Sequence, residues 1–419
     1  MMQRKRKTIS SIVMMIITLS TLSVISQIRS PISVDAQESL DNKVHSGVSF
    51  IGYYTACKDV NDDIDPLYFE KSFPIIAQAG FDHIRYMIWW ECYGQNPEMF
   101  LKELETVAKT ADKYGLKVVY AHHNYRTSSY LEPNGAKGFP PSLFESNPAY
   151  LPNSTGKFNR AAAEGISDTS TKLFWTNWWN RDVTDSNGNE GWTLLSDFLK
   201  QIVNVVDKYN STLGYEMLDE HQIYNKEDWE KIGQFYTFVS GELRTMTDKT
   251  LIYGRQAFYH INGPTEATAA NMAKMAPANT TNVVFKTTIY GLPLENSGTE
   301  ERFNLYNEAA IIAGVPLYVG EFGLGIRTNS EVPEINQDMM TFFIQKFEGD
   351  PNVWGWTYWR WGIEDQSNPT FILFKYEDGT IVPTKYFDYL NNAIAAIKLN
   401  PAPIDEQEFS VGIDSAFRQ

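Results

Sequence analysis

The sequence alternates between short apolar segments rich in β-branched and aromatic residues and longer amphipathic segments. The amphipathic segments, such as 99–115 and 194–209, carry apolar residues three and four apart, which is typical of helices that cover a sheet. Continuously apolar strands alternating with such helices predict a parallel sheet. No glycine-rich phosphate turn follows the first strand, so the repeated units favour a closed (β/α)8 barrel, a TIM barrel, over an open doubly wound sheet. The eight predicted strands are 49–57, 83–90, 117–124, 212–220, 250–256, 282–290, 316–323 and 353–361.

One connection is much longer than the others. Residues 125–191 follow the third predicted strand, and loops of that length in a compact domain are usually functional. The chain contains no internal repeat and no linker-like stretch, so we predict a single domain over 48–400. A polar segment, 37–47, precedes this domain and a short polar tail, 401–419, follows it.

The first 36 residues have the pattern of a secretory signal peptide. Four basic residues at 4–7 precede a mostly apolar run at 11–26, and Val34-Asp35-Ala36 provides a small-residue cleavage site. The alternative is an uncleaved N-terminal membrane anchor. Both interpretations place the folded part outside the cytoplasm. No later segment is long and apolar enough to span a bilayer, so we expect no membrane span in the mature chain.

Charge and cysteine content exclude two classes of protein. There are 51 acidic residues against 36 basic ones, a net charge of −15, and an acidic surface repels phosphate backbones. We therefore expect no nucleic-acid partner. With two cysteines, Cys57 and Cys92, a disulfide framework is excluded. These cysteines end the first two predicted strands, so one bridge is plausible, but the sequence does not show that they come within reach.

Carboxylates and aromatic residues stand where predicted strands end, which is where the catalytic residues of such barrels lie. The fourth strand ends in Asp219 and Glu220, the seventh carries Glu321, and the eighth holds Trp354, Trp356, Trp359 and Trp361. Each residue taken singly is more often a salt-bridged carboxylate or a packed tryptophan. Together they indicate glycosidic bond cleavage, because one carboxylate can protonate the departing oxygen while the other attacks the sugar or activates a water.

These segments, in this order, resemble the motifs of glycoside hydrolase family 5, the large cellulase and mannanase family of clan A. GYEMLDE (214–220) is similar to the acid/base motif of the family, and VGEFG (319–323) to its nucleophile motif. HIRYMIWW (83–90), VVYAHHN (118–124) and WTYWRW (356–361) resemble its second, third and eighth strands. The likeness spans residues 48–400, nearly the whole predicted mature chain.

The resemblance implies that Glu220 is the acid/base and Glu321 the nucleophile of a retaining mechanism with a covalent glycosyl-enzyme intermediate. It also implies that Arg85 and Tyr290 bind the nucleophile, that His123 lines the sugar subsite and that Trp359 forms its floor. The substrate-binding residues implied in this way are Arg85, His123, Asp219, Tyr290 and Trp359.

Two positions depart from the family pattern. The residue before the acid/base is normally Asn, which donates a hydrogen bond to the sugar 2-hydroxyl, and here it is Asp219. An ionised Asp219 cannot donate, and it would raise the pKa of Glu220 by like-charge repulsion. The sixth strand normally carries His-x-Tyr, and here it reads Thr288-Ile289-Tyr290. Because of these departures, a barrel that binds sugar without cleaving it remains an alternative interpretation.

We expect no metal and no cofactor. His122 and His123 are neighbours on a strand and point to opposite faces, and the chain has no HxH, HExxH or CxxC motif. Residues 59–70 have the ligand spacing of an EF-hand loop, but Ile64 stands where the sharp turn requires glycine, so we interpret them as an acidic loop.

Two further loops could contribute to a sugar-binding cleft. The tryptophans of the long insertion, Trp175, Trp178 and Trp179, either extend the cleft as stacking platforms or form an apolar cluster of their own. Residues 362–379 form a second loop at the same end of the barrel, with Asp and Asn side chains that could bind hydroxyl groups.

The sequence therefore predicts a secreted, monomeric, retaining glycoside hydrolase that acts on a β-linked poly- or oligosaccharide. β-1,4-Glucan is the default substrate, as for an endoglucanase, while mannan, mixed-linkage glucan or a glycolipid head group would use the same machinery. The alternatives are an inactive carbohydrate-binding barrel and a structural cell-envelope barrel, and the latter would lack an aligned pair of Glu residues at the mouth.

Overall fold

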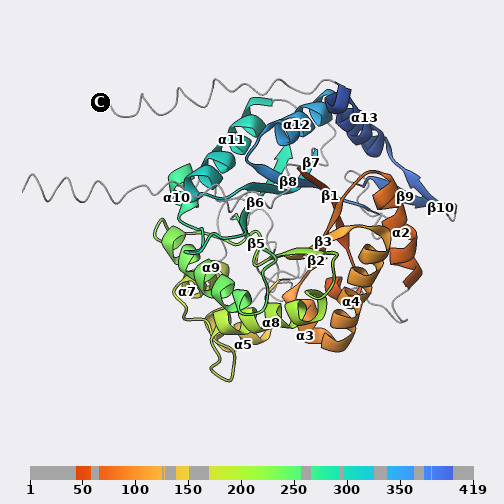
Figure 1. The fold of residues 1–419 in the computed structure, drawn as a ribbon. Helices are drawn as coiled ribbons and strands as arrows, with labels where there is room; N and C mark the ends of the chain where they lie inside the picture. The colour runs from red at the N-terminus through yellow and green to blue at the C-terminus, as the bar shows by residue number, and fades with distance from the viewer. Residues whose placement is uncertain are drawn as a thin grey trace, which may run out of the picture. The chain divides into compact units, whose positions relative to one another are not determined.

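Eight parallel strands close into a barrel in sequence order, and helices surround them (Figure 1). The barrel closes because β1 pairs in parallel with both β2 and β8. This architecture confirms the predicted (β/α)8 fold. The strands are β1 (His45–Ile51), β2 (His83–Ile88), β3 (Lys117–His122), β4 (Thr212–Glu216), β5 (Thr250–Gly254), β6 (Val283–Gly291), β7 (Leu317–Leu324) and β8 (Val353–Tyr358).

The computed structural model describes residues 44–57, 66–124, 127, 138–150, 169–255, 266–291, 296–324, 337–362, 372–378 and 380–399. The predicted signal peptide, most of the polar segment 37–47, residues 59–65 of the acidic loop, residues 363–371 of the second mouth loop and the tail 401–419 lie outside these residues. Within the described part of the chain, no helix combines the length and apolar character needed to cross a bilayer.

The helices begin and end at residues whose chemistry favours a helix end. Asn96 precedes α4 and its side chain accepts a hydrogen bond from the backbone of Met99, while Gly115 ends the helix with a φ of 71°. Glu190 precedes α8, and its carboxylate accepts hydrogen bonds from the first free N–H groups of that helix. The helices are α2 (Pro66–Gln78), α3 (Trp90–Gln95), α4 (Pro97–Tyr114), α5 (Ser142–Glu145), α7 (Thr169–Trp179), α8 (Gly191–Val206), α9 (Asp228–Arg244), α10 (Ala269–Ala273), α11 (Asn296–Ala313), α12 (Gln337–Gly349) and α13 (Lys385–Leu399), with short 3-10 turns η2 (Tyr54–Ala56) and η3 (Pro148–Tyr150).

After β8, β9 (Phe374–Glu377) and β10 (Thr380–Pro383) form a small antiparallel ribbon. The main apolar core fills the space between the strands and the helices. A separate buried cluster draws one residue from each of five barrel strands: Val119, Ile252, Val284, Tyr318 and Trp354. Side chains in such a barrel interior form packed layers, so the polar residues farther along the strands lie above a closed floor.

The tryptophans of the long insertion belong to the core. Trp175 and Trp178 are fully buried and Trp179 is 2% exposed, and their rings pack against Phe139 and Phe235. The indole nitrogen of Trp179 donates to the backbone of Gln222. The interpretation of these rings as sugar-stacking platforms is therefore wrong, because their faces are already covered by other aromatic rings.

Cys57 and Cys92 form a disulfide, with their Cα atoms 5.0 Å apart. The bond links the turn after β1 to the start of α3 after β2, so it ties two neighbouring loops at the carboxyl end of the barrel. The bridge that the sequence left undecided is thus formed.

Candidate active site

Charged and polar side chains from five strands converge at the carboxyl end of the barrel. Arg85 lies on β2, His123 follows β3, Glu216 lies on β4, and Glu321 lies on β7. Asp219 and Glu220 follow β4, which ends four residues earlier than the sequence predicts. On β6, alternate residues face the interior, which brings in Lys286, Thr288 and Tyr290.

Arg85 joins three carboxylates in a fully buried setting. Its Nη1 lies 2.5 Å from Glu321 Oε1, its Nη2 lies 2.9 Å from Asp219 Oδ2, and its Nε lies 2.8 Å from Glu216 Oε2. Burial alone would lower the pKa of Arg85, but the three carboxylates outweigh it and raise the pKa well above its usual value. The guanidinium is therefore a permanent positive charge that fixes all three acids.

Glu321 has donors on both oxygens. Tyr290 donates to Oε2 over 2.9 Å, while Arg85 holds Oε1. Burial favours the neutral acid, but the charges of Lys286, Arg85 and His123 prevail and lower the pKa of Glu321 below its usual value. Glu321 is thus ionised at neutral pH, as an attacking carboxylate must be.

Glu220 has the opposite electrostatic environment. Burial raises its pKa, and the negative charges of Glu321 and Asp219 raise it further. Its backbone has a φ of 46°, in the left-handed region, and its N–H donates to Asp219 Oδ1 over 2.8 Å. Two carboxylates whose pKa values move in opposite directions within one buried site are suited to divide acid and nucleophile roles.

Asp219 is an ionised acceptor. Burial would raise its pKa, yet the charges and hydrogen bonds of Lys286, His123 and Arg85 hold that pKa well below its usual range. Oδ1 accepts from the backbone of Glu220, and Oδ2 accepts from Arg85 and Lys286. This carboxylate therefore cannot act as the amide donor that the family pattern has at this position.

Of the four tryptophans on and after β8, Trp359 alone is partly exposed. Its ring centroid lies 6.3 Å from that of His123, so these two side chains border the same part of the site. Trp354 belongs to the lower barrel cluster, Trp356 packs on Phe322, and Trp361 packs on Phe374. Trp359 is therefore the one indole of these four whose ring is partly accessible at the site.

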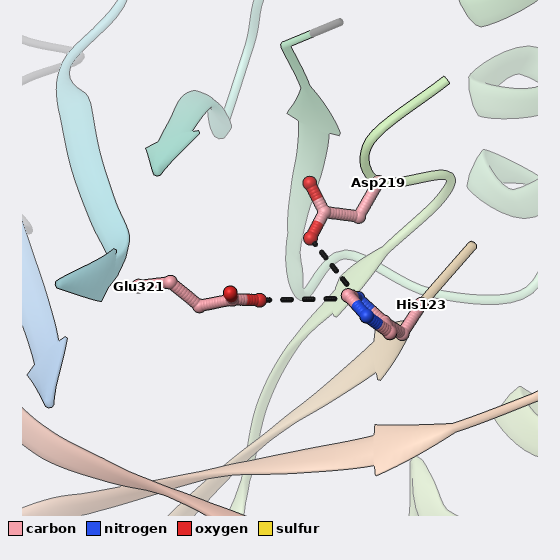
Figure 2. A group of neighbouring side chains, drawn as sticks. All are labelled: His123, Asp219 and Glu321. Atoms are coloured by element: carbon pink, nitrogen blue, oxygen red, sulfur yellow. Dashed lines mark ion pairs between the residues drawn. The ribbon is translucent and has the colours of Figure 1, made fainter. Parts of the chain in front are cut away.

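His123, Asp219 and Glu321 lie close enough to suggest a metal site, since one potential ligand atom from each falls within 4.8 Å of the others (Figure 2). His123 Nδ1 is 3.4 Å from Asp219 Oδ2 and 3.8 Å from Glu321 Oε1. Arg85 already binds these same two oxygens, and Lys286 also binds Asp219 Oδ2. A metal ion would have to displace resident cations, so we interpret the group as an ion-pair cluster.

The neighbouring His122 points away from this cluster. Its Nδ1 is 3.0 Å from the carbonyl oxygen of Met217, and its ring packs against Trp90 and Phe198 under the helices. The prediction that adjacent histidines face opposite sides is confirmed.

Two buried residues of the site, Glu216 and Lys286, were not predicted from the sequence. Each is the one charged residue of its observed strand, TLGYE for β4 and VVFKTTIYG for β6, a signal that could have identified them. All seven predicted residues lie at the carboxyl end of the barrel. Glu216 is the last residue of β4 and pairs with Arg85, while Lys286 lies within β6 and pairs with Asp219.

Comparison with known proteins places these features in a family context. A family model described as Cellulase (glycosyl hydrolase family 5) matches residues 68–365. Endo-glycoceramidase II from Rhodococcus sp., solved as a lactosyl-enzyme intermediate, matches with a TM-score of 0.60 at 15% identity, over 83% of this chain and 78% of that one. An endogalactoceramidase matches with a TM-score of 0.59 at 15% identity, over 84% and 81% of the two chains. At these identities the structural likeness shows a shared fold. No curated protein matches the chain.

Proposed function

The chain belongs to glycoside hydrolase family 5, and on that basis we propose that it cleaves a β-linked glycan with retention of configuration, using Glu321 as nucleophile and Glu220 as acid/base. The observation that carries the assignment is the setting of these two buried carboxylates: Arg85 and Tyr290 donate to the two oxygens of Glu321, and the pKa values of Glu321 and Glu220 shift in opposite directions. A lowered pKa favours the ionised form of Glu321, which can attack, and a raised pKa favours the protonated form of Glu220, which can donate.

The reaction would proceed in two displacements. First, a Glu321 oxygen forms a bond to the anomeric carbon while the glycosidic bond breaks, and the departing oxygen takes the proton of Glu220. Second, Glu220 removes a proton from a water molecule, whose oxygen attacks the anomeric carbon and releases Glu321. This assignment predicts that the two carboxylates are separated by about 5–5.5 Å in the working enzyme.

The other residues would support the charge changes of these steps. Glu321 loses its negative charge when the ester forms and regains it when the ester breaks. Arg85 and Tyr290 donate to that carboxylate and would hold it in one orientation throughout. His123 and Trp359 border the site and would contact the sugar.

We propose a β-1,4-glucan as the first substrate to test, and secretion as the route to it. The disulfide supports an oxidising compartment, which agrees with residues 1–36 acting as a signal peptide ahead of a domain at 48–400. Glycolipid head groups belong in the same screen, because the endo-glycoceramidase that shares the fold was also solved with ganglioside GM3.

The test is a substrate screen with purified wild type beside Glu321→Ala. Release of reducing ends would be followed on carboxymethylcellulose, glucomannan, mixed-linkage glucan and laminarin, and release of the sugar head group on GM3. Glu230→Ala, which removes an exposed carboxylate of α9, is the matched control. We expect turnover by wild type and control, and a loss of at least about three orders of magnitude in Glu321→Ala.

The two carboxylate roles can be separated with azide and an aryl β-glycoside that has a good leaving group. In Glu321→Ala, azide would enter from the vacated face and give the α-glycosyl azide. In Glu220→Ala, azide would attack the glycosyl-enzyme and give the β-glycosyl azide. The reverse pattern would overturn the assignment. A folded wild type that binds glycans but cleaves none would support the inactive carbohydrate-binding barrel.

A further inference from the structure

Lys286 is a fully buried cation beside the nucleophile. Its Nζ binds Asp219 Oδ2 and lies 2.7 Å from Thr288 Oγ1. The same nitrogen is 3.6 Å from Glu321 Oε1 and 3.9 Å from Glu216 Oε1. An ammonium group without water is costly unless it is paired, and here three carboxylates and a hydroxyl surround it.

Glycines on the neighbouring strands leave space for the side chains of Lys286 and Asp219. A Cβ atom on Gly320 of β7 would lie 2.6 Å from Cγ of Lys286 and 2.7 Å from its Cε. A Cβ atom on Gly254 of β5 would lie 3.0 Å from Cα of Asp219 and 3.2 Å from its Oδ1. Both distances to Lys286 are too short for a real side chain, so glycine at 320 is what allows the lysine stem to pass.

The ammonium also links the two departures from the family pattern. The hydroxyl of Thr288 touches Nζ, so a larger side chain at 288 would occupy the place of the ammonium group. An amide at 219 would remove the charge that Lys286 neutralises. Thr288 leaves space for the Lys286 ammonium group, and Asp219 provides its countercharge. Both departures from the family pattern therefore belong to one arrangement.

We propose that Lys286 is a positioning residue that neutralises Asp219 and places a positive charge beside Glu321, and that Asp219, Lys286 and Thr288 act as one arrangement. This inference rests on the proposed function of Glu321. It also explains why Asp219 and Thr288 need not disable the site, since Lys286 balances the charge of Asp219 and supplies a cation beside Glu321.

The pH profile should report this role. Six titratable side chains surround the Lys286–Glu321 pair. They come from β2, from β6 and from the ends of β3 and β4, and they are Arg85, His123, Glu216, Asp219, Glu220 and Tyr290. Burial raises the pKa of Glu321, and the charge of Lys286 is the largest influence that lowers it. Removing that charge should therefore raise the pKa of Glu321 and move the acid limb of kcat/KM to higher pH.

The experiment is a double-mutant cycle with Lys286→Met, Asp219→Asn and the double variant, with Lys113→Met on the surface as the control. An aryl β-glycoside is the substrate, and pH profiles and urea unfolding are recorded for all. We expect Lys286→Met to lower kcat/KM at least about 100-fold and to raise the pH of the acid limb, and Asp219→Asn in that background to recover on the order of 10-fold. An unmoved acid limb, or losses that simply multiply, would overturn the proposal.

Unfolding separates this inference from the proposed function. If the wild type cleaves nothing, the proposed function fails, but the unfolding free energies of the wild type, the two single variants and the double variant still measure the coupling between Lys286 and Asp219. If Lys286→Met does not fold, its rescue by Asp219→Asn is the expected result, because removing both charges leaves no unpaired buried ion. A double variant that is less stable than either single variant would contradict the pairing.

Discussion

The phenol oxygen of Tyr290 lies 2.9 Å from Oε2 of Glu321, on the opposite side of the carboxylate from the Arg85 hydrogen bond. The two donors come from β6 and β2, which lie on different sides of the barrel. Because each oxygen has its own donor, the carboxylate is held against rotation as well as kept ionised.

Replacing Tyr290 by Phe should remove one of these donors while the ring remains. A hydrogen bond to a charged group contributes about 1.5–3 kcal/mol, so we expect kcat/KM on an aryl β-glycoside to fall by about 10- to 100-fold. The matched control is Tyr253→Phe, because the Tyr253 hydroxyl is buried and has no hydrogen-bond partner among the residues that the structure describes. Equal losses in the two variants would show that the Tyr290 hydrogen bond is not responsible.

The proposed roles also predict a bell-shaped dependence of kcat/KM on pH. Activity needs Glu321 ionised, so it should be lost as pH falls through a pKa lowered below 4.5. Activity needs Glu220 protonated, so it should be lost as pH rises through a pKa raised above 4.5. With a substrate whose activated leaving group needs no proton, the basic limb of the pH profile should disappear in Glu220→Gln. A basic limb that persists there would assign it to another residue.

The sequence was a good guide to the barrel because strand and helix periods are local properties. Six of the strands begin and end within three residues of the predicted bounds. β1 runs over 45–51 instead of the predicted 49–57, and β4 ends at Glu216 instead of Glu220. The ordered strand ends also brought the predicted site residues to one end of the barrel. These are consequences of topology, which the alternating pattern determines.

What the sequence could not show depends on contacts across the barrel. Arg85 meets Glu216 from 131 residues away, and Lys286 meets Asp219 from 67 residues away. A lone lysine in an apolar strand indicates a buried charge but not its partner. The tryptophans of α7 were ambiguous for a related reason, since an aromatic ring suits both a core and a sugar platform, and only the packing of Phe139 and Phe235 decides.

The disulfide should contribute to stability through the unfolded state. It joins residues 35 apart in the sequence, and a crosslink around a loop of that size restricts the unfolded chain by about 3–4 kcal/mol. We expect Cys57→Ser/Cys92→Ser to lower the free energy of urea unfolding by that order. A reducing agent should destabilise the wild type to the same extent and leave the double variant unchanged. A reductant effect on the double variant would point to some other cause.

His122 should make the fold less stable in mild acid. It is fully buried, and burial lowers its pKa from 6.5 to about 4, although its hydrogen bond to Met217 opposes the shift. Below pH 6.5 the unfolded chain binds a proton that the folded chain does not accept until about pH 4. The contribution of His122 to the free energy of unfolding is therefore fully present above pH 6.5 and is lost as pH falls toward 4. The total loss is on the order of 3 kcal/mol.

His122→Asn tests this prediction, because an amide can still donate to the Met217 carbonyl but does not titrate. Urea unfolding of both proteins would be compared at about pH 7 and about pH 5, a range in which the wild type should lose about 2 kcal/mol through this group. We expect a smaller loss in the variant. His221, also buried and with a pKa lowered to about 3, should act in the same direction, so His122→Asn/His221→Asn should flatten the dependence further. Equal pH dependence in all three proteins would mean that acid acts on the carboxylates of the fold rather than on its buried histidines.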